Sequence, residues 1–380
     1  MRPLQGLKVV ELARILAGPW IGQMLADLGA EVVKVESPQG DDTRTWGPPF
    51  IERDGDRSAA YFYSCNRGKT SVIADFNTEE GRRTIRELVA DADILVENFK
   101  KGGLKKYGLD YASLSALNPR LVYCSITGFG QDGPYAERAG YDFLIQGMAG
   151  LMSVTGEADG QPQKVGVAVT DILTGLYGAV GILAAIEQRH TTGRGQHIDM
   201  ALLDCATAAM ANQAMNFLAT GKAPQRRGNS HPNIAPYQVF ATADGHIIVA
   251  VGNDGQFRRF CTVLDLPALP NDPRFATNDR RVANRDALTA LLQAALDRRP
   301  SAPLLQALEA ATVPAGPINT LDQVFDDPQV VARGLRIAPE GVPGVRGPWV
   351  FSDAELALER TAPVLPRQSP PASATETRDD

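Results

Sequence analysis

The sequence predicts an α/β protein, with a largely parallel sheet in a large first domain and a smaller second domain. In the first half, short runs of β-branched residues alternate with helical patterns, as in strands that are joined by crossover helices. The chain has 380 residues, which is more than one hydrophobic core usually serves. A polar, basic stretch at 221–230 (GKAPQRRGNS) separates the two halves and is the expected linker.

The first half supplies the expected sheet elements in order. Buried strands are expected at 7–12 (LKVVEL) and 31–36 (EVVKVE), with a helix over 18–29 between them. Thr78 is expected to cap the next helix, which is rich in Glu and Arg and ends near Asp91. The remaining expected elements are strands at 94–97, 121–126 and 196–200, a weaker helical pattern at 142–154, and a helix of small residues at 201–220.

The strongest helical pattern covers 170–190 (TDILTGLYGAVGILAAIEQRH). Thr170 is expected to cap this helix, Asp171 places an acid in its first turn, and a basic pair precedes Gly193. The middle of the helix is apolar nearly all round, so the helix is expected to be buried.

The second half begins with a predicted hairpin, in which the strand patterns YQVFAT and HIIVAVG flank the turn residues 243–245. We therefore divide the chain into a large domain at 1–220, a small domain at 221–320 and a return to the large domain at 321–366. The last residues, 367–380, are polar and rich in proline, and they are expected to form a disordered tail.

The composition is that of an ordinary soluble protein, with 44% hydrophobic and 22% charged residues. A formal net charge of −6 argues against nucleic acid as the main partner. The four cysteines form no CxxC pair, and charges interrupt the N-terminal segment, unlike a signal peptide. No uninterrupted apolar run approaches the roughly 20 residues of a membrane span, so we expect a cytoplasmic protein without a membrane partner.

One glycine motif suggests a cofactor site, but its context opposes that assignment. Residues 128–133 match GxGxxG after an expected strand. A dinucleotide site needs a helix that opens at the last glycine, whereas Pro134 and more loop follow here. Since GxxxxGK[ST], GxSxG and HExxH are also absent, we expect no nicotinamide, flavin or metal cofactor.

Asp171 is the residue that best fits a chemical role. In the first turn of a helix, unpaired N–H groups and the positive end of the helix dipole favour an ionised carboxylate, which is the form that a nucleophile needs. Acids in first turns are more often simply stabilising caps. Spacing alone therefore favours the capping role, and both interpretations stay open at this point.

Two basic segments are candidates to hold phosphate groups. One is the loop at 97–106 (ENFKKGGLKK), which follows an expected strand and so lies where open α/β sheets bind ligands. The other contains Arg67 and Lys69. Solvated basic residues are the alternative for both segments. His231, in NSHPN at the domain junction, could orient a carboxylate or could be a turn residue.

Taken together, these segments resemble the class III CoA-transferases of the formyl-CoA transferase type, whose fold is shared with the α-methylacyl-CoA racemases. The resemblance runs in the same order from residue 5 to about 355, through LKVVELARILAGPWIGQMLADLGAEVVKVE, CNRGKTSV, VENFKKGGLKKYGLD, NPRLVYCSITGFGQDGPYAERAGYDF, VAVTDILTGLYGAVGILAAIEQRHTTGRGQHIDMALLD, GNSHPNIAPYQVFATADGHIIVAVGN and VPAGPI. It implies a Rossmann-like large domain, a smaller α+β domain and an interlocked homodimer.

The resemblance also implies the chemistry. Asp171 matches the family's catalytic aspartate in VAVTD, so it is expected to attack an acyl-CoA and to form an aspartyl-CoA thioester, from which a carboxylic acid accepts CoA without a metal. The family's contacts with coenzyme A match a set of residues in the first half of this chain: Ile15, Leu16, Ala17, Asn98, Phe99, Lys106 and Tyr141.

Departures from the family pattern narrow the range of expected substrates. Formyl-CoA transferases have glutamine where this chain has Leu16, which argues against formate and oxalate, and arginine where it has Ser37, so one phosphate contact is absent or replaced. The segment GNSHPNIAPYQVF looks most like transferases of dicarboxylates such as succinyl-CoA. Candidates to meet the far carboxylate are therefore Arg227, Asn229 and His231.

Two other functions remain as alternatives. Racemases of this fold use a histidine where this chain has Tyr141. A phenol, with an ordinary pKa of about 10, is a poor proton shuttle at neutral pH, so transfer is favoured over racemisation. The third possibility is a non-catalytic relative that only binds acyl-CoA.

Overall fold

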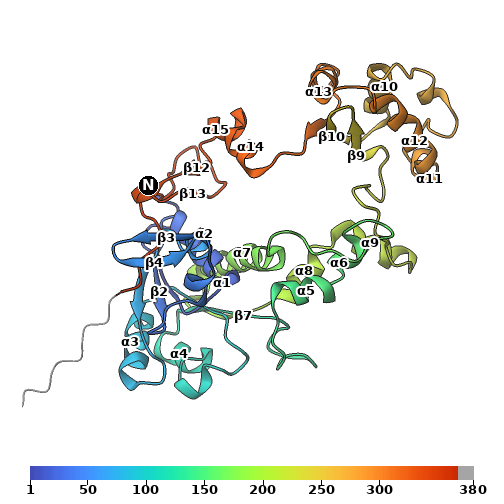
Figure 1. Cartoon of the computed structure of the whole chain (residues 1–380). Coiled ribbons are helices and arrows are strands. Elements are labelled where there is room, and N and C mark those ends of the chain that lie inside the picture. The colour runs from blue at the N-terminus through green and yellow to red at the C-terminus, as the bar shows by residue number, and fades with distance from the viewer. Residues whose placement is uncertain (367–380) are drawn as a thin grey trace, which may run out of the picture. The chain divides into compact units, whose positions relative to one another are not determined.

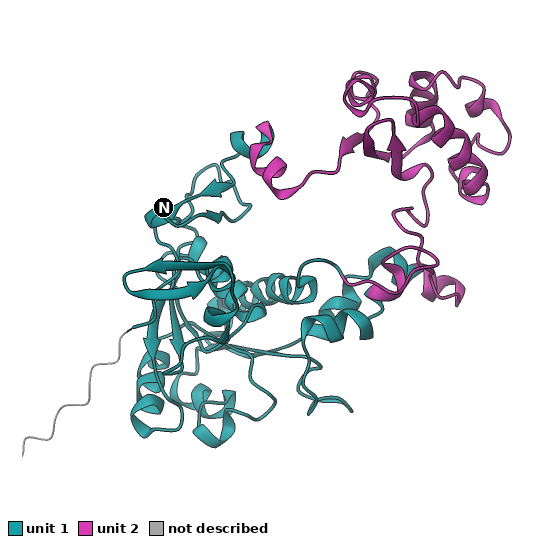
Figure 2. Ribbon diagram, viewed as in Figure 1, with its two compact units in different colours: residues 1–151, 165–215, 329–380 teal, residues 152–164, 216–328 magenta. Residues whose placement is uncertain are grey.

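The computed structural model describes residues 1–366, and the tail predicted at 367–380 lies outside them. The chain divides into two compact units (Figure 1, Figure 2). Among the described residues, the first unit contains 1–151, 165–215 and 329–366, and the second contains 152–164 and 216–328. Each unit has a hydrophobic core of its own.

A six-stranded sheet forms the centre of the first unit. Its strands run in the order β5-β2-β1-β6-β7-β8, and every neighbouring pair is parallel. The chain moves outward from β1 to β2 and β5, and then returns to the other side of β1 with β6. The carboxyl ends of β1 and β6 therefore border a switch point, where open α/β sheets bind ligands. The strands are β1 (Lys8–Glu11), β2 (Glu31–Glu36), β5 (Thr70–Ile73), β6 (Ile94–Glu97), β7 (Val122–Thr127) and β8 (His197–Ala201).

Helices cover both faces of this sheet, because its strands carry apolar side chains on both sides. Val9 belongs to one core with Ile21 of α1 and Ile182 of α7, whereas the next residue, Val10, belongs to another core with Ile85 of α3. Each such side chain contributes about 1.5–3 kcal/mol by burial. The predicted α/β fold with a parallel central sheet is confirmed. The helices are α1 (Ala17–Asp27), α2 (Ala60–Cys65), α3 (Glu79–Ala90), α4 (Tyr111–Leu117), α5 (Asp142–Met148), α6 (Leu151–Val154), α7 (Val169–Thr192), α8 (Leu202–Ala208) and α9 (Ala211–Thr220).

Short elements complete the first unit. The hairpin of β3 (Phe50–Arg53) and β4 (Asp56–Ala59) precedes α2, and the strands β12 (Arg336–Ile337) and β13 (Gly344–Val345) pair after α15 (Pro328–Ala332). The helical patterns predicted at 142–154 and 201–220 are each divided into two helices.

The long helix α7 differs from its prediction in three respects. Its N-cap is Ala168, and Thr170 lies inside the first turn. One face is exposed at Leu176, Tyr177 and Val180, so burial all round was a wrong expectation. The opposite face packs against α1. By length and composition α7 could cross a membrane, contrary to our reading of the apolar runs, although core helices of soluble proteins meet the same criteria.

The second unit combines a small antiparallel sheet with helices. The predicted hairpin is present as β9 (Tyr237–Thr242) and β10 (Gly245–Ala250), and β11 (Ala315–Pro317) pairs with the free edge of β10. Phe240 and Ile247 of this sheet share a core with Phe257 and Leu292. The helices are α10 (Asp254–Val263), α11 (Asn278–Ala283), α12 (Arg285–Leu296), α13 (Ser301–Ala310) and α14 (Leu321–Asp326).

Candidate active site

A cavity of about 410 Å³ lies at the switch point of the parallel sheet. Three segments at the carboxyl ends of strands line it: residues 14–17 after β1, residues 98–101 and 103 after β6, and residues 126–128 at the end of β7. Asp171 from the first turn of α7 and Tyr141, which precedes α5, also line it. The strand order thus brings the basic loop after β6 beside the proposed nucleophile.

This cavity contains most of the site residues that the sequence singled out. Seven of them line it: Ile15, Leu16, Ala17, Asn98, Phe99, Tyr141 and Asp171. Lys106 does not, because the chain enters a short 3-10 helix at Lys105–Tyr107, where the ammonium group of Lys106 lies 4.6 Å from the centre of the Tyr107 ring. Positive charge at the cavity comes instead from Arg14, Lys100, Lys101 and Arg138.

The carboxylate of Asp171 is not used as a helix cap. Asp142 of α5 takes that role, because its Oδ1 accepts hydrogen bonds from the Thr170 backbone N–H at 2.8 Å and from the Thr170 hydroxyl at 2.6 Å. The N–H of Asp171 approaches the same oxygen at 3.4 Å. Within residues 1–366, no group donates a hydrogen bond to the Asp171 carboxylate. The carboxylate is therefore left without a structural partner at the cavity.

The environment of Asp171 favours its neutral form. Burial, and then the negative charge of Asp142, raise the pKa of Asp171 to about 7. This reverses the expectation that the helix N-terminus would keep the group ionised, because desolvation and a like charge outweigh the roughly 0.3–1 kcal/mol that a helix dipole supplies. Burial, and then the charge of Asp171, also raise the pKa of Tyr61 on α2 to about 12.

Sequence reasoning missed both Asp142 and Tyr61. Asp142 stands next to Tyr141 as an acid in a first helical turn, which is a weak signal that many stabilising acids share. Tyr61 lies in a short helix without a polar pattern. Only the packing of α2 and α5 near the start of α7 reveals that these two side chains affect Asp171.

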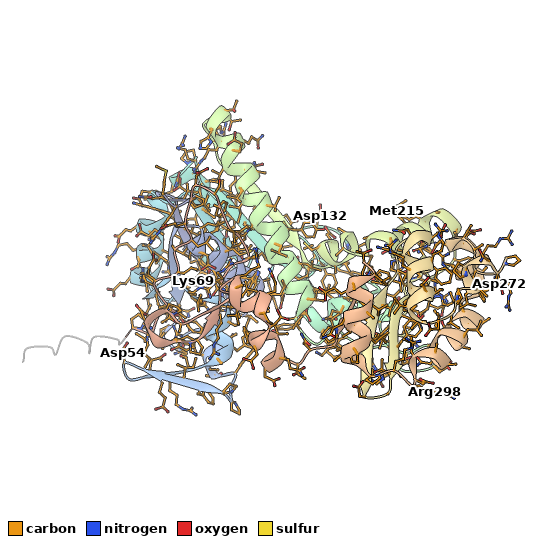
Figure 3. The ribbon with its side chains drawn as sticks, turned by 90° about the horizontal axis from the view of Figure 1, so that it is seen from above. Asp54, Lys69, Asp132, Met215, Asp272 and Arg298 are labelled. Carbon is orange, nitrogen blue, oxygen red and sulfur yellow. The ribbon has the colours of Figure 1, made fainter. Side chains whose placement is uncertain are left out.

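Arg67 and Lys69, the other candidates for phosphate binding, are structural instead. Arg67 forms an ion pair with Asp27 at 2.6 Å. Lys69, labelled in Figure 3, is fully buried and pairs with Glu11 at 2.8 Å. Both cations are therefore committed to partners inside the first unit.

The glycine motif at 128–133 forms a loop, and no helix opens at its last glycine. Gly128 lies against Gly140, since a Cβ atom on either residue would come within 2.5 Å of the other's Cα atom. Both glycines line the cavity, so they serve the close approach of two loops in its wall. In the described part of the chain, no three His, Cys, Asp or Glu side chains gather into a group that could hold a metal ion.

Comparisons with known proteins agree with this architecture. The family model described as CoA-transferase family III matches residues 4–369. The chain belongs to CoA-transferase family III. It is 56% identical over 371 residues to the succinate–glutarate CoA-transferase of Agrobacterium fabrum, covering 96% of this chain and 93% of that protein. It is 42% identical over 371 residues to the succinyl-CoA:glutarate CoA-transferase of Homo sapiens, covering 96% and 84%.

A solved structure extends the agreement to three dimensions. The crystal structure of a CAIB/BAIF family protein from Brucella suis matches this family III chain with a TM-score of 0.87 and 63% identity, covering 96% of each chain. The protein is thus an enzyme of the class III CoA-transferase family, as the sequence indicated, and not a mere binder. CoA-transferases use CoA thioesters as substrates.

Proposed function

We propose that this enzyme transfers CoA from a dicarboxyl-CoA, such as succinyl-CoA, to a carboxylic acid through Asp171. The observation that carries the proposal is a partly buried carboxylate, to which no group of residues 1–366 donates a hydrogen bond, in the cavity at the switch point of a family III fold. The relatives at 56% and 42% identity are named for transfer involving succinate or succinyl-CoA and glutarate, which supports a dicarboxylate substrate.

The proposed reaction proceeds through acyl groups on Asp171. The ionised carboxylate attacks the thioester carbonyl of the donor, and CoA thiolate leaves a mixed anhydride. The thiolate attacks the aspartyl carbonyl, which releases the donor acid and forms an aspartyl-CoA thioester. The acceptor carboxylate attacks this thioester and again expels CoA thiolate, which then attacks the acceptor carbonyl and regenerates Asp171.

Each step exchanges one activated acyl group for another, so covalent catalysis divides a difficult transfer into easier ones. Because the pKa of Asp171 is about 7, the reactive carboxylate form is expected to decrease below neutral pH. The phenol of Tyr61 stays protonated, with its pKa at about 12, and it is a candidate donor to oxyanions that form beside Asp171.

The residues that the sequence offers to meet the far carboxylate, Arg227, Asn229 and His231, all belong to the second unit, as does Arg285. Burial, and then the positive charge of Arg227, lower the pKa of Arg285. Burial, and then the charge of Arg285, lower the pKa of His231. The guanidinium of Arg285 is fixed, because it donates to the carbonyl oxygen of Ile234 at 3.2 Å. An anion beside Arg227 and Arg285 would relieve the repulsion between these two guanidinium groups. His231, whose Nδ1 accepts a hydrogen bond from the Asn233 N–H at 3.1 Å, is a neutral candidate donor to such an anion. Asn229 stays a prediction from the sequence.

The test is a substrate screen with mass spectrometry. The enzyme is incubated with succinyl-CoA and a panel of mono- and dicarboxylic acids in deuterated water, and transfer produces the new acyl-CoA. A racemase would instead incorporate deuterium at the α-carbon without a new thioester, and that result would contradict the proposal. Asp171→Asn is expected to abolish transfer while CoA binding and the folded structure remain. Hydroxylamine or borohydride added during turnover should mark Asp171 in the wild type only.

The proposal includes a cytoplasmic homodimer. An association between copies would cover apolar side chains that a single chain exposes on α7, namely Leu176, Tyr177 and Val180. Light scattering after size-exclusion chromatography is expected to give twice the mass of the chain at micromolar concentration. A stable monomer with full activity would contradict this part of the proposal.

A further inference from the structure

One wall of the cavity is a turn with an unfavourable backbone conformation. Residues 14–16, between β1 and α1, form this turn, and together with Ala17 they line the cavity. Ile15 has a φ angle of 73°, which is the left-handed region that β-branched residues avoid because of steric crowding at Cβ. Such a conformation persists only where the surrounding structure holds it in place.

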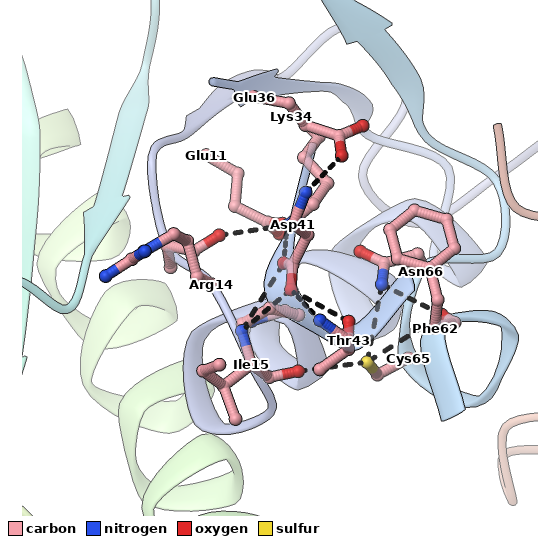
Figure 4. Close-up of polar contacts among 12 residues, drawn as sticks. Glu11, Arg14, Ile15, Lys34, Glu36, Asp41, Thr43, Phe62, Cys65 and Asn66 are labelled. Carbon is pink, nitrogen blue, oxygen red and sulfur yellow. Dashed lines mark hydrogen bonds and ion pairs between the residues drawn. The ribbon is translucent and has the colours of Figure 1, made fainter. Parts of the chain in front are cut away.

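Side chains from three distant segments hold the backbone of this turn. Both carboxylate oxygens of Asp41 lie near the backbone nitrogen of Ile15, at 3.3 and 3.4 Å, and the thiol of Cys65 approaches the Ile15 carbonyl at 3.5 Å (Figure 4). Asn98 accepts a hydrogen bond from the Arg14 N–H at 2.9 Å and donates one to the Arg14 carbonyl at 2.6 Å. Two consecutive residues are thus fixed at both their N–H and carbonyl groups.

The carboxylate of Asp41 is itself fixed in position. It is 2% exposed and forms an ion pair at 2.9 Å with Lys34, which is 1% exposed. It also accepts hydrogen bonds from the backbone N–H and the hydroxyl of Thr43, at 3.0 and 2.8 Å. Lys34 in turn donates to the carbonyl of Ala13 at 2.9 Å, one residue before the turn. Lys34 and Asp41 therefore hold the backbone on both sides of Arg14, at Ala13 and at Ile15 (Figure 4).

The ionisation states suit these contacts. Although burial alone would raise the pKa of Asp41, the charge of Lys34 and hydrogen bonds from Lys34 and Thr43 bring it below its ordinary value. Burial raises the pKa of Cys65 to about 12, so the thiol keeps its proton and can donate. The contacts with Ile15 therefore persist across neutral pH.

We infer that Asp41 is a positioning residue for CoA transfer: through the N–H of Ile15 it holds the strained turn that forms the cavity wall beside Asp171. Asp41 does not line the cavity, so it acts through the turn and not on the substrate. Displacement of reacting groups by about 1 Å can lower the rate by a factor of about 100. A change in the conformation of this wall is therefore expected to lower the rate of CoA transfer. The inference rests on the proposed function at this cavity.

The test is a double-mutant cycle between Asp41→Asn and Ile15→Gly. Asparagine has the size of aspartate but loses the charge that pairs with Lys34. Glycine adopts a positive φ without strain, so it removes the need for the restraint. We expect Asp41→Asn to lower kcat/KM about tenfold or more when residue 15 is isoleucine, and about threefold at most when residue 15 is glycine, whatever the activity of Ile15→Gly itself. In the double variant, kcat/KM is expected to return to within about threefold of Ile15→Gly.

A matched control separates positioning from general destabilisation. Asp93 forms an ion pair at 2.7 Å with the buried Arg189, next to the amino end of β6 and away from the turn. Asp93→Asn is expected to lower Tm and to leave kcat/KM within about twofold of the wild type. A loss of kcat/KM that appears with Asp41→Asn and not with Asp93→Asn, and that Ile15→Gly reverses, would support the inference. The inference would be overturned if the two substitutions changed kcat/KM by independent factors that simply multiply in the double variant. A folded Asp41→Asn enzyme with normal kcat/KM would also overturn it.

If Asp41→Asn does not fold, the contact between the Cys65 thiol and the Ile15 carbonyl provides the test. Cys65→Ala removes the donor to Ile15 and is expected to lower kcat/KM several-fold, with rescue by Ile15→Gly, whereas Cys65→Ser keeps a donor and most of the activity. Equal activity of the two Cys65 variants would overturn the inference. A wild-type enzyme without CoA-transferase activity would refute the proposed function and this inference together. An active wild type, together with Asp41 and Cys65 variants that keep the wild-type kcat/KM, would refute the positioning role alone.

Discussion

Replacing Asp171 by asparagine is expected to stabilise the folded protein at pH 8 while it abolishes transfer. Folding raises the pKa of Asp171 from 3.8 to about 7. Below pH 3.8 the carboxyl group is protonated in both states, so it costs nothing. Between the two values the unfolded chain is ionised and the folded chain is not, so the free energy of unfolding decreases as the pH rises. Above pH 7 the cost is constant.

The size of the effect follows from the same pKa. At about 1.4 kcal/mol for each pH unit, the rise on folding corresponds to about 4 kcal/mol. This is an upper bound, because Asp171 is partly exposed and solvent screens its charge. We therefore expect Asp171→Asn to increase the free energy of unfolding by about 1–3 kcal/mol at pH 8, and by roughly a third of that amount at pH 5.

Urea denaturation at both pH values measures this difference, and each kcal/mol should also raise Tm by about 2–4 °C. Glu79→Gln is the matched control, since Glu79 is also an acid in a first helical turn of the same unit. Hydrogen bonds from Arg86 and Arg82 lower the pKa of Glu79, so removing its charge is not expected to stabilise the fold. A gain for Asp171→Asn that is absent at pH 8, or equal at pH 5 and pH 8, would refute the reasoning.

Three further predictions concern the surroundings of the site. Asp142→Asn removes a negative charge that raises the pKa of Asp171. The acid limb of the kcat/KM profile, expected near pH 7 in the wild type, should therefore move to lower pH in this variant, and an unmoved limb would contradict the electrostatic assignment. Lys69→Ala leaves a buried carboxylate with one cation fewer and should lower the free energy of unfolding by about 3–5 kcal/mol in urea titrations. Gly140→Ala places a Cβ atom 2.5 Å from the Cα atom of Gly128 and should lower both Tm and kcat/KM, whereas Gly166→Ala, with no atom within 4 Å, should change neither.

Most of the fold was predictable because its signals are local. The strands at Glu31–Glu36 and Ile94–Glu97 agree with the sequence prediction residue for residue. The Thr78 hydroxyl caps α3 as expected, by accepting a hydrogen bond from the Gly81 N–H at 3.0 Å. The hairpin of β9 and β10 also follows its turn signal. Alternation, capping and turn chemistry depend on neighbours a few residues apart, which the sequence displays directly.

The exceptions involve partners that are distant along the chain. Thr170 looks like an N-cap by its position, yet the start of α7 is capped by Asp142 from another helix. The apolar pattern of α7 suggested complete burial, but only one face meets α1 within this chain. Lys106 belongs to the expected basic loop, and the local turn at Lys105–Tyr107 takes it away from the cavity.

The sequence by itself determined the fold class, the family and the presence of Asp171 in a first helical turn. Only the tertiary structure decided how that residue behaves, because a pKa depends on burial and on charges that other segments bring within a few Å. The same holds for Ile15, whose left-handed backbone depends on Asp41, Cys65 and Asn98 from three separate segments. Local propensities do not encode such restraints, since they arise only when these segments pack together.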